Sequence, residues 1–324
     1  MLTRLSFRDG VAGLVFLGLL AFAAQAEYFG LELLAEIAIF AILAMSLDLL
    51  AGVAGLVSLG HAAFFGLGAY GFALLTVLLG WPPGLALMVA PLATGVLALV
   101  VGAIVTRVRG IFFIMITLAF GEMGHEFVFQ NRALGGDDGL AGIPRLDLSA
   151  LGLDLADPRV FAVTALLLAV LVYLALAWLL ATPYGKALAG IHSNEQRMRA
   201  LGLPVRAYKT SAFALAGAIA GLAGVLAAQH TQFITPQLLH WTTSGEILVM
   251  VILGGLATLV GPVVGAILLT LLRHELSNYT DYWGLWLGLF LILVVVSGRN
   301  GLVGVAGQLW RRWGPRRARA RGHA

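Results

Sequence analysis

One stretch of the sequence decides the fold: residues 84–106 read GLALMVAPLATGVLALVVGAIVT and contain no charged side chain. A helix needs roughly 20 mostly apolar residues to cross the hydrocarbon core of a bilayer, and this stretch meets that length. Residues 160–181 and 211–228 are also apolar and uncharged. We therefore expect at least three membrane-spanning helices in a polytopic membrane protein.

Further apolar stretches are weaker candidates for spans, and all of them could cross the membrane with some tilt. They cover residues 11–26, 33–52, 56–79, 111–130 and 282–298. The first of these follows Arg4 and Arg8 and ends at Ala24-Gln25-Ala26, a pattern that is also typical of a secretory signal with its cleavage site. We favour a retained first span because the rest of the chain is expected to lie in the membrane.

The composition supports this class of protein. Of the 324 residues, 60% are hydrophobic and 11% are charged, and the mean hydropathy is +0.96, so the chain lacks the charge that a large water-facing surface requires. The net charge of +4 is confined to short segments between apolar stretches, which indicates topology rather than nucleic-acid binding. The chain has no cysteine, so disulfides and thiolate metal sites are excluded.

The positions of Lys and Arg predict the orientation of the spans. Arg107 and Arg109 lie between two spans, the 182–209 loop is basic, and seven arginines without an acid follow residue 297. These segments are expected in the cytoplasm. The 131–159 loop holds five aspartates and three arginines, so it is expected outside. Both termini are then expected in the cytoplasm.

Successive spans must place their loops on alternate sides of the membrane, and one apolar segment does not fit this order. If residues 247–272 were an ordinary span, the arginine-rich tail would lie outside. Gly254-Gly255 and Gly261-Pro262 fall inside this segment, and we expect a broken or re-entrant pair of helices. A second glycine-rich interruption at residues 52–61 suggests a weak internal repeat.

These observations predict the fold class and the domain organisation. We expect an all-α membrane protein with about eight transmembrane helices plus the broken segment. Residues 1–310 would form one transmembrane domain, with an external loop at 131–159 and a cytoplasmic loop at 182–209. Residues 311–324 would form a basic cytoplasmic tail.

Several motifs of soluble enzymes occur only as fragments. The G-x-G-x-x-G pattern at residues 66–71 lies in an apolar run, and no acid follows it until Glu122, so close helix packing explains it better than dinucleotide binding. Neither His125-Glu126 nor His274-Glu275 has the second histidine of H-E-x-x-H. We expect no metal, no cofactor and no catalytic site in this chain, so any ATP would be hydrolysed by another subunit.

Polar residues at membrane depth are the candidates for a translocation path, because ionisable groups there are costly and often functional. The candidates are Asp48, Ser58, His61, Glu122, Gly254 and Gly255. Two alternatives stay open. Asp48 lies near a helix end, where it would cap the helix or face the interface, and Glu122 with His125 and Glu126 also fits a helix end that emerges at the interface.

The cytoplasmic loop contains a predicted amphipathic helix at residues 186–201. Its apolar face repeats at spacings of three and four residues, through Leu188, Ile191, Glu195, Met198 and Leu201. Such a helix docks either on another protein or on the anionic lipid surface, and the residues alone leave both possibilities open.

A set of short segments, in this order, resembles the LivM-type permeases of branched-chain amino acid ATP-binding-cassette (ABC) transporters. The segments lie at residues 43–52, 58–70, 117–122, 135–144, 184–195, 220–224 and 253–262. Together they cover about residues 40–270. This resemblance implies a permease for branched-chain amino acids or a similar small polar solute, which works by alternating access.

The resemblance also implies partners and site residues. It implies two ATP-binding subunits, a second related permease and an external solute-binding protein. The ATPase-coupling residues would be Gly185, Lys186, Leu188, Ile191, Asn194, Glu195 and Leu201. Asp137 and Asp138 would contribute to docking of the binding protein. The family usually has Asn at the position of Asp48, and Arg-Glu-Asn-Glu where this chain has His192-Ser193-Asn194-Glu195.

A rival class is an ion-coupled secondary transporter that works as a single chain. It would use Asp48, Glu122 or Glu126 as an ion relay. Acids are scarce in the middle of the expected spans, which argues against this alternative.

Overall fold

The computed structural model describes residues 7–146 and 154–279, together with 282, 284–286, 288–290, 292 and 301. The described helices are α1 (Phe7–Gln25), α2 (Tyr28–Asp48), α3 (His61–Ala73), α4 (Pro83–Val105), α5 (Ile111–Gln130), α6 (Pro158–Ala181), α7 (Pro183–Ser193), α8 (Glu195–Ala200), α9 (Val205–Thr231), α10 (Trp241–Gly254) and α11 (Val260–Tyr279). Wider turns, η1 (Leu49–Val53) and η2 (Leu74–Leu78), extend α2 and α3, and short 3₁₀ turns are η3 (Arg132–Leu134), η4 (Gly136–Asp138) and η6 (Pro236–Leu239). Two two-residue strands, β1 (Leu140–Ala141) and β2 (Phe233–Ile234), pair antiparallel.

The expected polytopic all-α fold is confirmed. Within the described residues, seven helices are long and apolar enough to cross a membrane: α2 with η1, α3 with η2, α4, α5, α6, α9 and α11. The apolar α1 and α10 are shorter. Most of the predicted span at 282–298 and the basic tail at 311–324 lie outside the described residues, as does part of the external loop, residues 147–153.

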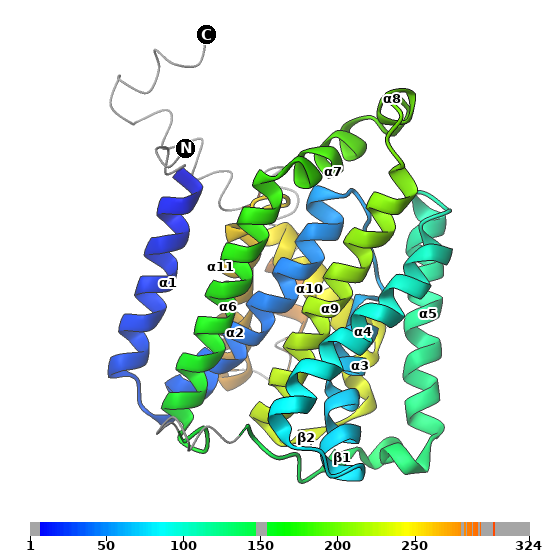
Figure 1. Cartoon of the computed structure of the whole chain (residues 1–324). Helices are drawn as coiled ribbons and strands as arrows, with labels where there is room; N and C mark the ends of the chain where they lie inside the picture. Colours follow the sequence, from blue (N-terminus) through cyan, green and yellow to red (C-terminus); the bar gives the residue numbers. More distant parts are fainter. Residues whose placement is uncertain are drawn as a thin grey trace, which may run out of the picture.

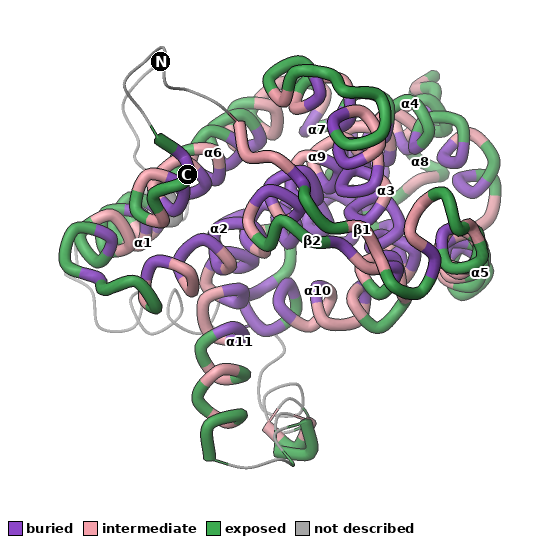
Figure 2. Tube along the Cα trace, turned by 90° about the horizontal axis from the view of Figure 1, so that it is seen from below, coloured by how far each residue is buried: buried purple, intermediate pink, exposed green. Residues whose placement is uncertain are grey.

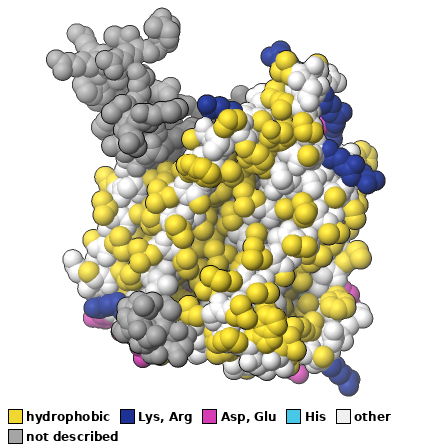
Figure 3. All heavy atoms as spheres, in the orientation of Figure 1, with side chains coloured by type: hydrophobic (Ala, Val, Ile, Leu, Met, Phe, Trp, Pro, Cys, Tyr) yellow, Lys and Arg dark blue, Asp and Glu magenta, His cyan; other side chains and the backbone are white. Residues whose placement is uncertain are grey.

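The helices form one bundle with α2, α3 and α9 at its centre and with α1, α4, α5 and α6 toward its outside (Figures 1 and 2). Exposed apolar side chains cover the middle of the face in Figure 3, and charged side chains gather toward its two ends. Examples are Leu92 on α4, which is 67% exposed, and Leu171 on α6, which is 60% exposed. This distribution suits a bundle whose sides face lipid, where exposed apolar area carries no penalty.

Glycines bring the central helices unusually close together. A Cβ on Gly68 of α3 would lie 2.2 Å from the carbonyl oxygen of Gly221 on α9, and one on Gly217 would lie 2.3 Å from the Cβ of Ala98. Small residues replace the hydrophobic effect as the basis of helix association in lipid, because they allow dense van der Waals packing. The interpretation of the 66–71 pattern as a packing surface is therefore confirmed.

The two ends of the bundle carry different segments. At one end, here called the β end, β1 and β2 join the loop after α5 to the loop after α9. At the other end, the α7 end, α8 meets the loop between α4 and α5 through an ion pair of 2.8 Å between Arg109 and Glu195. The basic loops that the charge pattern placed on one side of the membrane thus lie at one end.

The predicted interruption near residue 255 is confirmed. The α10 and α11 helices run antiparallel as a tight hairpin, because Gly254 lies against the backbone of Gly261 and Gly265 against that of Met250. Residues 255–259 between them, here called the second break, are not helical. Residues 54–60, here called the first break, likewise separate η1 from α3.

The predicted continuous helix at residues 186–201 is wrong. Asn194 has an extended backbone, with φ −158° and ψ 96°, and divides the segment into α7 and α8. Its side chain accepts a hydrogen bond of 2.9 Å from the Arg197 amide and so caps α8. Asparagine is a strong N-cap residue, and this local bond competes with continuation of α7.

Candidate functional site

The second break and η1, the turn that precedes the first break, meet around the carboxylate of Asp48. This side chain is fully buried, and its two oxygens accept hydrogen bonds from the amides of Ala257 (2.7 Å) and Leu259 (3.1 Å). Gly52, one turn further, leaves room for this contact, since a Cβ there would lie 2.4 Å from the Ala257 nitrogen. Asp48 therefore does not cap its own helix, which continues into η1. It holds the second break and the start of α11, where a helix dipole favours negative charge.

A hydroxyl from α10 holds the first break in a similar way. Ser244 is buried, and its Oγ accepts a hydrogen bond of 2.8 Å from the amide of Ala62 in the first turn of α3. Ser58 is also buried, and its Oγ accepts a hydrogen bond of 3.3 Å from the Gly60 amide. Each break is thus stabilised from the other half of the chain, by Asp48 of α2 for the second break and by Ser244 of α10 for the first.

His61 lies beside the first break and is fully buried. Its Nε2 is 2.7 Å from the Oγ of Ser46, and that hydroxyl donates to the carbonyl of Leu43 (2.6 Å). Because the only proton of the hydroxyl is used, Nε2 of His61 carries the proton in this contact. Nδ1 then has a free lone pair, and it has no hydrogen-bond partner among the described residues.

Helix α7 contacts the first break directly. Nδ1 of His192 is 3.0 Å from the carbonyl oxygen of Gly52, and the imidazole ring covers Gly55, which has a φ of +71°. A Cβ on Gly55 would lie 2.8 Å from this ring. A hollow of about 600 Å³ opens beside this contact, lined by Gly52, Val53, Leu180, Gly185, Lys186, Ala189, His192, Ser193 and Ala257.

The predicted coupling residues fall into two groups. Gly185, Leu188 and Ile191 are buried against the bundle, so the side chains of Leu188 and Ile191 fasten α7 to it. Lys186, Asn194 and Leu201 are exposed, and Leu201 is 71% exposed although it is apolar. The outward face of α7, α8 and the residues that flank α8 therefore shares only Leu201 with the apolar face that the spacing predicted.

Glu195 fastens α8 to the bundle. Its oxygens lie 2.8 Å from each of Lys209, Arg109 and Arg199. Burial raises the pKa of this carboxyl, but the Lys209 hydrogen bond and the three positive charges outweigh burial and leave the pKa below its ordinary value. The side chain is thus an anionic anchor within the chain.

Glu122 lies on α5, which is at the outside of the bundle (Figures 1 and 2). Its Oε1 accepts a hydrogen bond of 3.1 Å from the amide of Trp241, the first residue of α10, and His240 lies 3.9 Å from its Oε2. The ring centroid of His125 lies 5.1 Å from that of His240. Glu122 and His125 therefore support the start of α10.

The aspartates predicted to dock a binding protein are exposed on a well-fixed loop at the β end. Asp137 and Asp138 belong to η4, which β1 follows directly. Arg145 fastens the same loop, because its guanidinium donates to the carbonyls of Gln229 (3.1 Å) and His230 (3.2 Å) at the end of α9. This bonding satisfies carbonyl groups that a helix end leaves unpaired.

Comparison with known proteins gives the family. The family model described as "Branched-chain amino acid transport system / permease component" matches residues 30–296. This chain belongs to that family. The resemblance seen in the sequence is confirmed, and the chain is a permease of an ABC importer in the bacterial inner membrane.

Curated relatives of this family permease include two LivM proteins. The chain is 32% identical over 287 residues to the high-affinity branched-chain amino acid transport system permease protein LivM of Escherichia coli K12, covering 82% of this chain and 68% of the relative. The LivM protein of Salmonella typhimurium is 30% identical with the same coverage. The autoinducer 2 import system permease protein LsrC of Yersinia pseudotuberculosis is 33% identical over 144 residues, covering 42% of this chain and 40% of the relative. No solved structure matches the chain.

Membership has consequences for cofactors and partners. Permeases of ABC importers work with separate ATP-binding subunits, which hydrolyse the ATP, and with a solute-binding protein. Among the described residues of this family permease, no group of three His, Cys, Asp or Glu residues is placed to hold a metal ion.

Sequence reasoning missed the residues that stabilise the breaks from a distance. Ser244 and Ser46 contact the start of α3, directly after the first break, and His192 contacts the break itself at Gly55. A single serine in an apolar helix gives no signal of such a role, since it satisfies its hydroxyl equally well within its own helix.

Proposed function

We propose that this permease moves branched-chain aliphatic amino acids, or a closely similar small polar solute, that an external solute-binding protein delivers. The family description and the LivM relatives support this solute class. No bond of the solute is broken in such a cycle. The work comes from ATP hydrolysis in partner subunits, and the chain alternates between states open to either side.

We infer that the α7 end faces the cytoplasm, together with both termini, and that the β end faces outside. Support comes from the charges, because Arg107, Arg109 and Lys186 lie at the α7 end, whereas Asp137 and Asp138 lie at the β end. Basic residues in short loops favour the cytoplasmic side.

We propose that the outward face of α7 and α8 docks onto an ATP-binding subunit, through Lys186, Asn194 and Leu201. Exposed apolar area next to basic side chains suits a protein interface at the membrane surface. The complete importer would hold two ATP-binding subunits and a second related permease. Asp137 and Asp138 would contact the solute-binding protein.

One observation carries the mechanism: His192 of α7 touches Gly52, and Gly52 touches the break that Asp48 holds. A displacement of α7 by the ATPase would therefore reach the first break directly, at Gly55, and the second break through Gly52 of η1. We propose that this movement separates the breaks and opens a path past Asp48, Ser58, His61, Gly254 and Gly255. Glu122 contributes indirectly, by holding the start of α10.

The test is purification of the native complex in mild detergent, followed by uptake of radiolabelled L-leucine into proteoliposomes with ATP inside. We expect the ATP-binding subunits to accompany the chain, Leu201→Glu to release them, and Ser193→Ala on the same surface to retain them. A chain that purifies alone and takes up leucine without ATP would instead be an ion-coupled carrier.

A further inference from the structure

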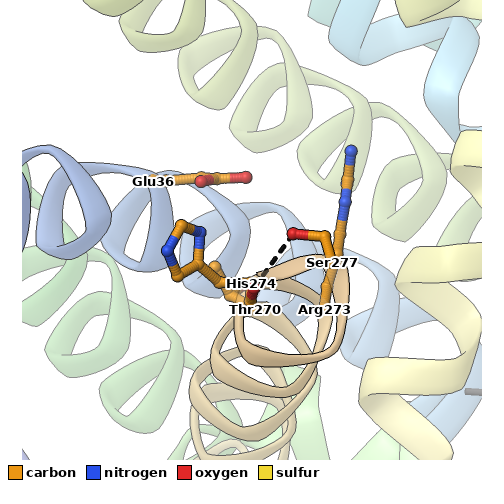
Figure 4. A pocket seen from close by; sticks show the side chains of 5 residues that line it. All are labelled: Glu36, Thr270, Arg273, His274 and Ser277. Atoms are coloured by element: carbon orange, nitrogen blue, oxygen red, sulfur yellow. Dashed lines mark hydrogen bonds between the residues drawn. The ribbon is translucent and has the colours of Figure 1, made fainter. Parts of the chain in front are cut away.

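Charged residues from three helices meet on the β-end side of the bundle, away from the two breaks. Glu36 of α2 faces α11, from which Arg273 rises beside it (Figure 4). Arg273 forms an ion pair with Glu246 of α10, at 3.6 Å. Glu36 lies eight residues into α2, about 12 Å along the helix, so it is near the middle of a membrane roughly 30 Å thick. Charges at such depth are costly and usually functional.

These side chains surround a hollow of about 320 Å³. It is lined by Glu36, Thr270, Arg273, His274 and Ser277. The volume lies within the roughly 300–1,000 Å³ that is usual for small-molecule sites. His274 is held in place by Phe29 at the start of α2, with ring centroids 4.6 Å apart.

Thr270 gives an independent indication of a ligand. Its side chain is 4% exposed, lines the hollow, and its Oγ1 has no hydrogen-bond partner among the described residues. Other buried threonines in the spans, such as Thr94, donate to a carbonyl one turn earlier in their own helix. An unpaired buried hydroxyl costs stability, so a partner supplied from the hollow would explain it.

The hollow continues into a narrow apolar part. Phe40, Met250 and Leu269 line this part together with Glu36, Glu246, Thr270 and Arg273. Its volume is only about 10 Å³, so the apolar side chains are closed against one another. The site therefore has groups of both charges at its mouth and an apolar floor that must part before anything enters it.

We propose that this hollow binds the solute in transit, as an α-amino acid zwitterion with an aliphatic side chain. The ammonium group binds Glu36, the carboxylate binds Arg273 and the Thr270 hydroxyl, and the aliphatic chain points toward Phe40 and Met250. The solute carboxylate competes with Glu246 for Arg273. This loosens the contact between α10 and α11 and lets the apolar floor open. The inference rests on the proposed function and adds the binding residues.

The test uses the native complex in proteoliposomes, with radiolabelled L-leucine as the probe. We expect Glu36→Gln and Arg273→Gln to lower ATP-dependent uptake by about tenfold or more, since each removes one charge partner of the zwitterion. ATP hydrolysis stimulated by the loaded binding protein should persist. Glu275→Gln is the matched control, because this exposed acid of α11 does not line the hollow.

A second variant separates binding from a structural role. Thr270→Val keeps the shape and removes the unpaired hydroxyl, so a purely structural role predicts unchanged or higher thermal stability and normal uptake. The proposal predicts the same stability, but an uptake rate that is at most about one third of the wild-type rate. Wild-type uptake in Glu36→Gln, Arg273→Gln and Thr270→Val would show that the hollow does not bind the solute. Absence of ATP-dependent leucine uptake in the wild type would overturn the proposed function itself.

Discussion

Both breaks interrupt the helices inside the bundle, but different interactions stabilise them. The first break is rich in glycine, and a neutral hydroxyl from Ser244 caps the helix after it. The second break contains two non-glycine residues in the left-handed region, Ala257 at φ 59° and Leu259 at φ 58°, and a buried carboxylate holds both of their amides. Left-handed backbone costs roughly 1–2 kcal/mol per such residue. The second break is therefore strained and held by charge, whereas the first is relaxed and contacts α7.

The largest expected effect comes from removing the charge that holds the second break. Asp48→Ala leaves two buried amides unpaired, each of which costs about 1–3 kcal/mol. We expect a large loss of thermal stability and faster hydrogen exchange at residues 255–260. Asp48→Asn keeps one acceptor oxygen and should lose about half as much. Equal stability of all three proteins in detergent would show that the carboxylate does not hold this break.

Gly52→Ala should have the next largest effect, because the added methyl group would push η1 away from the second break. The added Cβ would lie 2.4 Å from the nitrogen of Ala257 and in contact with the Asp48 carboxylate, so backbone must move. We expect reduced stability and loss of coupled uptake. Gly245→Ala on α10 is the control, since its Cβ would meet nothing within 4 Å. If both variants behaved alike, the close contact between Gly52 and the second break would matter neither for stability nor for uptake.

His192→Ala tests the contact that the first break has and the second lacks. The variant loses the bond to the Gly52 carbonyl and the ring on Gly55, and it leaves the buried part of α7 intact. We expect ATP hydrolysis to continue while leucine uptake falls about fivefold or more. Ser193→Ala, at the neighbouring exposed position, should leave both rates unchanged. Parallel loss of both rates in His192→Ala would point to a folding defect instead.

Glycine substitutions compare the backbone strain of the two breaks. Ala257→Gly relieves a left-handed residue and should stabilise the protein by up to about 1 kcal/mol. Ala54→Gly replaces a residue with φ −86° and should destabilise by roughly 0.5–1 kcal/mol. Thermal unfolding of the two variants measures the difference. The same sign for both would refute the assignment of strain to the second break.

The smallest effect concerns acid. The folded pKa of Glu195 lies below its ordinary value of 4.5, so its contribution to holding α8 is fully present above about pH 4.5 and disappears as the pH falls through the lower folded pKa. Spin labels on α8 and α9 should therefore keep their distance from neutral pH to about pH 5 and separate only below the ordinary value. The second break, which α8 does not contact, should not respond. If the two labels already moved apart near pH 6, the Glu195 carboxylate would not be the group that holds α8.

Much of this molecule could be predicted because the physics is local. Uncharged runs such as residues 84–106 can only be spans, and Gly254-Gly255 with Gly261-Pro262 cannot continue one helix, so both features were found in advance. The coupling segment was mispredicted because apolar spacing continued through Asn194, whereas the capping bond to Arg197 ends the periodicity there.

The partners of Asp48 and Thr270 could not be predicted in the same way. Asp48 bonds to residues more than 200 positions away, and Thr270 differs from the other threonines only in what surrounds it. The sequence alone determined the membrane class, the spans, the family and the positions of both breaks, because each depends on composition or short patterns. Only the tertiary structure decided that η1 and the second break meet at Asp48, that His192 reaches the first break, and that Glu36 and Arg273 line one hollow. Such contacts depend on which helix faces pack together, and in a bundle that is apolar inside and outside, hydrophobic periodicity does not specify those faces.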